Sequence, residues 1–117
     1  MTGVLAFLLA GCGNKDQQEA DAIKALVRAE MKDPEATRFT KLKMRLGNLC
    51  GEVNSKNSFG AYAGAEKFTA FRGGVSLRSK REYVDALQVA ANQPTTHFAE
   101  AFDKEWEQCQ REGKPVA

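Results

Sequence analysis

Apolar residues recur along the chain with helical spacing at both ends and alternate with polar residues in the middle. A helix is predicted over residues 16–31, where Ala20, Ile23, Val27 and Met31 share one face. Four later stretches alternate or form short apolar runs between turn residues, which predicts β-strands. These strands are expected over residues 38–46, 49–56, 61–71 and 75–77.

Two more helices are predicted after the strands. Residues 79–82 read Ser-Lys-Arg-Glu, the pattern of a capping box, and predict a helix start. The buried stripe of that helix is expected to comprise Tyr83, Leu87 and Ala90 or Ala91. A final helix is predicted from about residue 95 to 112, before Gly113. Its inward face is expected to comprise Phe98, Phe102, Trp106 and Cys109.

This order of elements predicts an α+β domain. A small antiparallel sheet of about four strands would pack against N-terminal and C-terminal helices, with the helices on one face. In the first strand, the inward residues are expected to be Leu42, Met44 and Leu46. We assign residues 20–113 to this single domain and residues 114–117 to a tail.

Composition is that of an ordinary soluble domain. Of the 117 residues, 43% are hydrophobic and 27% are charged. The net charge of +2 gives no electrostatic reason to expect nucleic acid as a partner. No glycine-rich phosphate loop or nucleophile signature is present, so we expect no cofactor.

An apolar run over residues 4–10 precedes the domain. It is far shorter than the ~20 residues of a membrane-spanning helix and fits the hydrophobic region of a secretory signal. The run ends in Leu-Ala-Gly-Cys at residues 9–12, which resembles the lipobox of bacterial lipoproteins. The resemblance implies that residues 1–11 are removed and that the sulfur of Cys12 is diacylated. Alternatively, residues 4–10 form a buried strand or helix of the domain, and residues 1–3 lack the usual Lys or Arg.

The lipobox resemblance also implies a location. Residues 12–19 would form a lipidated tether that holds the domain to a membrane of the cell envelope, facing the periplasm. Gly13 follows Cys12 where Asp would retain such proteins at the inner membrane, so the outer membrane is favoured.

If Cys12 is lipidated, Cys50 and Cys109 remain as an even pair in an oxidising compartment. We therefore predict a disulfide between them, with free thiols or a two-cysteine metal site as alternatives. A metal site is disfavoured because His97 is the only histidine and no CxxC or HxxxH spacing occurs.

Cys50 creates a difficulty for the strand pattern. Strict alternation directs Cys50 to the face of Asn54, opposite to Val53. A bulge at Gly51 would bring Cys50 inward beside Val53. Without that bulge, the last helix must cover the face that carries Asn54.

Residues 32–39 and 49–64 carry a more specific pattern. They read approximately K-D-P-x-A/S-x-x-F and then C-G-x-V-N-x-K-N-x-F/Y-G-G-Y-x-G, with Ala61 where glycine is usual. This block resembles a family of small exported lipoproteins of Gram-negative bacteria and their prophages. The resemblance covers about residues 20–75. It implies an envelope location and the domain boundaries, but no reaction.

The same block contains the candidate binding residues Asn54, Lys56, Asn57, Ser58 and Tyr62. Amide and hydroxyl groups around an aromatic ring would suit a glycan, a peptide or a partner's backbone. Alternatively, these residues supply turn chemistry and only shape the loop.

Other residues allow weaker functional interpretations. His97 could act as a general base, although a surface position at a helix start is favoured. Trp106 could stack on a sugar, although its register favours the core. Acidic residues that could form a glycosidase pair, or simply a solvated helix face, are Glu100, Asp103, Glu105 and Glu107. Basic residues that could approach anionic lipid, or face water, are Arg38, Lys41, Lys43 and Arg45.

Three functions therefore remain open. The preferred one is a non-enzymatic lipoprotein that binds an envelope protein or cell-wall glycan. The second is a cell-wall hydrolase that uses His97 and nearby carboxylates. The third is an accessory subunit of an envelope complex, which would show an exposed apolar patch.

Overall fold

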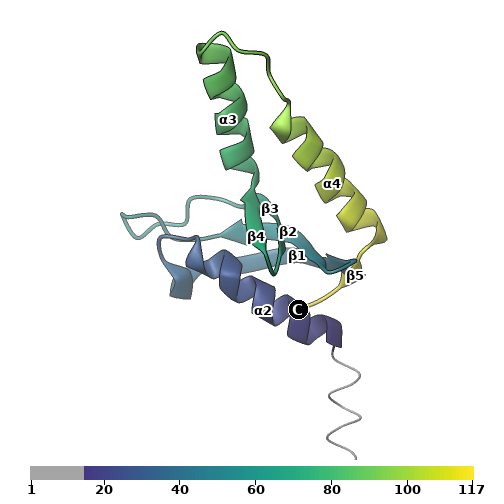
Figure 1. Cartoon of the computed structure of the whole chain (residues 1–117). Coiled ribbons are helices and arrows are strands. Elements are labelled where there is room, and N and C mark those ends of the chain that lie inside the picture. The colour runs from purple at the N-terminus through teal and green to yellow at the C-terminus, as the bar shows by residue number, and fades with distance from the viewer. Residues whose placement is uncertain (1–14) are drawn as a thin grey trace, which may run out of the picture.

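Figure 1 shows the computed structural model, which describes residues 15–117. The predicted signal peptide and Cys12 lie outside the described residues. Within the described part, no helix has the length and apolar character needed to cross a membrane.

Residues 15–117 form three α-helices and one antiparallel sheet, which confirms the predicted α+β class. The sheet order is β4-β3-β2-β1-β5, so a short fifth strand adds to the four expected. In chain order the elements are α2 (Lys15–Ala29), η1 (Pro34–Ala36), β1 (Arg38–Arg45), β2 (Asn48–Asn54), β3 (Glu66–Phe71), β4 (Gly74–Leu77), α3 (Arg78–Ala90), α4 (Phe98–Glu112) and β5 (Lys114–Pro115).

The main core lies between α2 and one face of the sheet. The helix contributes the predicted stripe of Ala20, Ile23 and Val27, all fully buried. They pack on side chains from all four longer strands, which is why this helix runs along the sheet in Figure 1. The strand residues of this core are Leu42, Met44, Leu49, Val53, Phe68, Ala70 and Leu77.

The opposite face of the sheet is covered by α4, so the prediction that helices cover one face is wrong. A second, smaller cluster on this face comprises Cys50, Phe102, Trp106 and Cys109. The sheet therefore has apolar contacts on both faces. Alternate residues of β2 are buried on opposite faces, with Leu49 and Val53 toward α2 and Cys50 toward α4.

The bulge predicted at Gly51 lies instead in β1, the strand opposite. Lys41 and Leu42 both face Gly51, and Lys41 takes a left-handed φ of 56°. The side chains of β2 therefore alternate strictly between the two faces. Cys50 points to the face that carries Asn54, and α4 covers this face, as expected for a strand without a bulge at Gly51. A Cβ on Gly51 would lie 2.8 Å from the Thr40 carbonyl oxygen, so the close approach of the bulge requires glycine here.

The prediction that Leu46 faces inward is wrong, because Leu46 lies in the turn between β1 and β2. Leu46, expected inside the sheet, is 83% exposed. Leu46 and Gly47 have φ values of 50° and 81°, and Arg45 pairs with Asn48 on either side. Positive φ at both central residues is the pattern of a type I′ hairpin turn, which directs Leu46 away from the strand.

Helix α3 begins one residue earlier than predicted and has no capping box. The Ser79 amide donates to Glu66 Oε1 at 2.9 Å, and the Ser79 hydroxyl also donates to that oxygen. Glu82, the expected capping partner, instead pairs with Arg78 at 2.9 Å. A carboxylate from β3 thus supplies the cap that the local pattern assigned to α3 itself.

Both ends of the described chain belong to the folded domain. Residues 15–19, assigned to the tether, form the first turns of α2. The predicted tail contributes β5, and Gln17 Nε2 donates to the Ala117 carbonyl oxygen at 2.7 Å. The two ends therefore meet at the start of α2.

Candidate functional site

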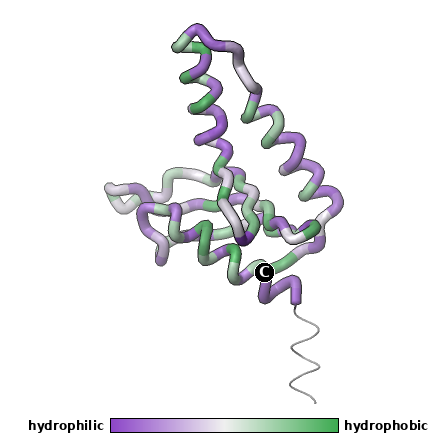
Figure 2. Tube along the Cα trace, viewed as in Figure 1, coloured by the Kyte–Doolittle hydropathy of each residue, from purple (hydrophilic) through white to green (hydrophobic). Residues whose placement is uncertain are grey.

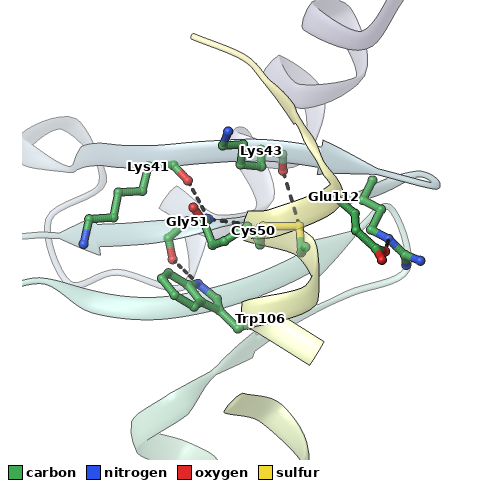
Figure 3. The surroundings of a disulfide bond; sticks show 9 residues. Lys41, Lys43, Cys50, Gly51, Trp106 and Glu112 are labelled. Carbon is green, nitrogen blue, oxygen red and sulfur yellow. Dashed lines mark hydrogen bonds and ion pairs between the residues drawn. A yellow bond between two sulfur atoms is a disulfide. The ribbon is translucent and has the colours of Figure 1, made fainter. Parts of the chain in front are cut away.

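The predicted disulfide is confirmed and fastens α4 to the sheet. Cys50 in β2 and Cys109 in α4 are bonded, with 6.3 Å between their Cα atoms. Beside them, the indole N–H of Trp106 donates to the Gly51 carbonyl oxygen at 2.9 Å (Figure 3). Trp106 is only 8% exposed, as expected for a core residue, so its ring is not available for a sugar.

The candidate binding residues gather in and beside the loop of residues 55–65, which links β2 to β3. Two of their amide side chains bond to the loop itself. Asn57 Oδ1 accepts from the Phe59 amide at 2.9 Å and from the Ala61 amide at 3.2 Å. Asn54 Oδ1 accepts from the Gly64 amide at 3.1 Å. These bonds favour the structural interpretation of the two asparagines.

The aromatic residues of this loop differ in exposure. The Tyr62 ring contacts two cations: its centroid lies 4.0 Å from the Arg38 guanidinium carbon and 5.8 Å from Lys56 Nζ. Phe59 has no such cover and is 93% exposed, while Ser58 beside it is also exposed. The loop is therefore held in its conformation by internal hydrogen bonds, and the side chain of Phe59 is exposed to solvent. Its binding role stays a prediction.

Helices α3 and α4 form a helical arm that rises from the sheet (Figure 1). The face of α3 that meets α4 is polar. Arg78 makes a two-point contact with the Asp103 carboxylate at 2.8 and 3.1 Å. Further along, Gln88 Oε1 accepts from the Thr96 amide at 2.9 Å. Polar contacts, rather than apolar packing, thus hold much of the arm together.

Asp85 joins this face as the N-terminal cap of α4. Its carboxylate accepts from the Ala99 amide at 3.0 Å and the Phe98 amide at 2.9 Å. The Ala99 bond, then the Phe98 bond and the charge of His97, lower the pKa of Asp85 below its usual range. The cap is therefore charged at neutral pH, when it complements the helix dipole.

The apolar stripe predicted for α3 exists, but it faces solvent rather than the core. No residue of α3 is buried. Tyr83 is 64% exposed and Leu87 is 49% exposed, with Val84 beside them also exposed. Figure 2 shows hydrophobic positions at intervals along α3, the helix that rises above the sheet. The helix turns its polar side inward to α4 and its apolar side outward.

A surface cavity of about 610 Å³ lies at the base of the arm. Its charged side chains mostly bond to one another: Arg78 contacts both Glu82 and Asp103. Hydrogen bonding to Arg78 lowers the pKa of Asp103, so this pair stays ionised. Lys67 lies over the Trp106 ring, 4.5 Å from its centroid. The cavity therefore offers a ligand few groups that are not already used.

The residues proposed for catalysis do not converge. His97 is exposed, takes a left-handed φ of 56°, and lines none of the larger cavities among residues 15–117. Of the carboxylates, Asp103 bonds to Arg78 and Glu100 pairs with Lys104 at 3.6 Å. Glu105 and Glu107 are exposed on α4. No group of His, Cys, Asp or Glu in the described chain is arranged to hold a metal ion.

The basic residues of β1 are largely engaged within the protein. Lys41 pairs with Glu52 at 2.6 Å, and Arg45 pairs with Glu112 at 2.8 Å. Arg38 stacks on Tyr62, and Lys43 is half-buried. This arrangement favours an ordinary solvated face over a patch for anionic lipid.

Sequence reasoning missed two exposed apolar features, Leu46 and the outward stripe of α3. A signal for Leu46 was present, because the dipeptide Leu-Gly stands where a two-residue hairpin turn normally has Asn-Gly. For α3, the polar residues at 78, 81, 85 and 88 also share one face, which marks a second possible packing side.

Comparison with known proteins adds no functional assignment. No protein-family model matches the chain, and searches of curated proteins and of solved structures found no match. The functional argument therefore rests on the residues and contacts described above.

Proposed function

We propose that this protein is a lipid-anchored envelope protein that binds another protein through the outward face of α3. The observation that carries the proposal is the reversed orientation of α3, with polar residues against α4 and Tyr83, Val84 and Leu87 in solvent. Exposed apolar faces of this kind mark interaction sites. The lipobox resemblance supports the anchor, and the Cys50–Cys109 disulfide is compatible with an oxidising compartment.

The chemistry of the stripe favours a protein partner over a glycan. Between Lys80 and Asn92, the exposed residues of α3 are apolar except Glu82 and Tyr83. Glu82 already pairs with Arg78 at 2.9 Å, so the Tyr83 hydroxyl is the polar group left for a ligand. Glycan recognition needs several such groups. An amphipathic helix instead fits an apolar groove, with residues spaced three and four apart as anchors.

The size of the stripe favours a groove over a flat contact with a second copy. A helix of 13 residues is roughly 20 Å long and about 10 Å wide. One face of it offers far less than the ~800 Å² per partner that a stable interface buries. A groove that encloses several sides of α3 reaches a larger area.

The anchor is tested first. Mass spectrometry of the membrane fraction is expected to find acyl chains on Cys12, and Cys12→Ser is expected to release the protein from membranes. Recovery of the chain from the cytosol with residues 1–11 attached would refute the anchor.

The binding face is tested by a photo-crosslinking amino acid placed at Tyr83 in intact cells. The matched control is the same group at Phe71, which is 53% exposed in the β3–β4 hairpin. We expect one heteromeric adduct from position 83, absent from position 71 and lost with Leu87→Lys. Adducts only to a second copy, or equal adducts from both positions, would contradict the proposal.

The hydrolase alternative has no comparable support. His97 is exposed and outside the cavities described above. The carboxylate of Asp85, whose pKa the charge of His97 helps to lower, already accepts hydrogen bonds from two amides of α4. A His97→Ala variant is therefore expected to keep any activity of the protein in cells.

A further inference from the structure

Leu46 occupies a position that folding alone does not explain. Its φ of 50° lies in the left-handed region, where Asn and Gly are favoured and a bulky residue is strained. Its side chain is 83% exposed, so it gains almost no burial in return. Both effects disfavour leucine at the tip of this turn in a protein surrounded by water.

The turn lies beside the place where the described chain begins. Asp16, in the first turn of α2, lines the same surface cavity of about 270 Å³ as Leu46 and Gly47. Lys114 of β5 lines it as well and lies 3.9 Å from the Asp16 carboxylate. The β1–β2 turn and the N-terminal end of α2 therefore form one end of the domain.

The short distance along the chain from Cys12 to Lys15 limits how far the start of α2 can lie from a membrane that holds Cys12. Three residues span at most roughly 11 Å when fully extended. A lipid on Cys12 would therefore hold the start of α2 within about 11 Å of the membrane interface, together with the turn beside it. The helical arm extends in a different direction, away from the start of α2 (Figure 1).

We propose that the β1–β2 turn is a membrane contact of the anchored domain, with the Leu46 side chain inserted into the interface of the bilayer that holds Cys12. This inference rests on the lipid anchor proposed above. Insertion would bury the exposed apolar surface of Leu46 and account for a leucine at a strained, solvent-facing position. It would also orient the domain, since the acyl chains and the turn are two separate attachments to one membrane.

Tryptophan fluorescence tests the contact in the acylated full-length protein, reconstituted in vesicles of phosphatidylethanolamine and phosphatidylglycerol. Leu46→Trp places a reporter at the turn. The matched control is Phe59→Trp, which is also highly exposed but follows the other end of β2. Trp106 is buried in both variants and supplies the same background.

We expect lipids with brominated acyl chains to quench the residue at position 46 and not the residue at position 59. An acylated protein in which position 46 is quenched no more than position 59 overturns the membrane contact and leaves the anchor standing. Protein recovered without acyl chains on Cys12 overturns both.

Leu46→Asn separates this role from a structural one. Asparagine suits a left-handed turn position. In Cys12→Ser protein free in buffer, Leu46→Asn should therefore lower the equilibrium constant for unfolding in urea by a factor on the order of ten. In vesicles, the same substitution should increase hydrogen exchange at the Gly47 amide, because the turn no longer inserts. A variant that is less stable, or that exchanges like the original protein in vesicles, contradicts the inference.

Discussion

The disulfide offers the sharpest test of how the helical arm is held to the sheet. We consider the double variant Cys50→Ala, Cys109→Ala. The two cysteines are 59 positions apart, so the bond closes a loop of about 60 residues. The chain-entropy relation for a loop of that length gives a loss of about 4 kcal/mol in the free energy of unfolding. Small domains have only about 5–15 kcal/mol in total, so this is a large part of it.

The loss should not be uniform across the structure. The sheet and α2 keep their own core, whereas α4 contacts the sheet through a cluster of four buried residues that includes both cysteines. Without the bond, Phe102 and Trp106 remain, with an indole hydrogen bond to Gly51 that contributes about 1 kcal/mol. Two exposed polar contacts with β1 also remain, from Gln110 to the Lys41 carbonyl oxygen and from Glu112 to Arg45. We therefore expect α4 and the arm to separate from the sheet at lower denaturant than the sheet itself unfolds.

Trp106 is the only tryptophan in the chain, so its fluorescence reports the contact of α4 with the sheet. Circular dichroism reports the whole fold. In urea, the two transitions should coincide for the original protein, and fluorescence should change first in the double variant. Coincident transitions in the variant, or a loss below about 1 kcal/mol, would refute the reasoning. Cys12→Ser, which leaves the disulfide intact, is the control.

Three further substitutions test the local geometry. Gly51→Ala should lower the free energy of unfolding by about 1–3 kcal/mol in urea titration, because the new methyl group meets the Thr40 carbonyl oxygen. Asp85→Asn should lower the melting temperature at neutral pH. Because the folded-state pKa of Asp85 is depressed, its contribution is complete above the unfolded pKa, and the difference between the proteins should vanish as pH falls through the folded value. Asn57→Ala should speed hydrogen exchange at the Phe59 and Ala61 amides, which lose their acceptor, and should leave exchange in the sheet unchanged.

Periodicity predicted the helices and the four longer strands, although β3 begins at Glu66 rather than at residue 61, and β5 was not expected. The stripe of α2 and the inward residues Leu42 and Met44 lie where the pattern places them. The α+β class and the disulfide could both be derived, the second from counting cysteines. The helices and strands depend on residues near one another in sequence. The disulfide could be predicted because only Cys50 and Cys109 remain once Cys12 is assigned to the lipid.

The faces of the sheet could not be assigned in the same way. Alternation in β2 places Val53 and Cys50 on opposite faces, and both are buried because a different helix covers each face. The bulge that adjusts the register lies in β1, where Lys41 takes a left-handed φ, and nothing in the sequence of β1 marks that residue. Contacts between segments distant in sequence determine which helix covers each face and where the bulge lies.

The candidate site was predicted only in part for a similar reason. Polar residues of the 55–65 loop were recognised by type, but Asn54 and Asn57 bond within the loop. The stripe on α3 was recognised by spacing and assigned to the core, because an amphipathic helix normally buries its apolar side. Here Asp85 and Arg78 bind α4 through the polar side, which leaves Tyr83 and Leu87 exposed.

The disulfide, the arm and the proposed location depend on one another. If α4 needs the Cys50–Cys109 bond to remain on the sheet, then the exposed stripe of α3 has a fixed orientation only where that bond can form. Such bonds are rare in the reducing cytoplasm and persist after export. The proposed anchor and the proposed binding face therefore require the same compartment. A protein that kept its arm on the sheet without the disulfide would remove this link, although each proposal would still have its own test.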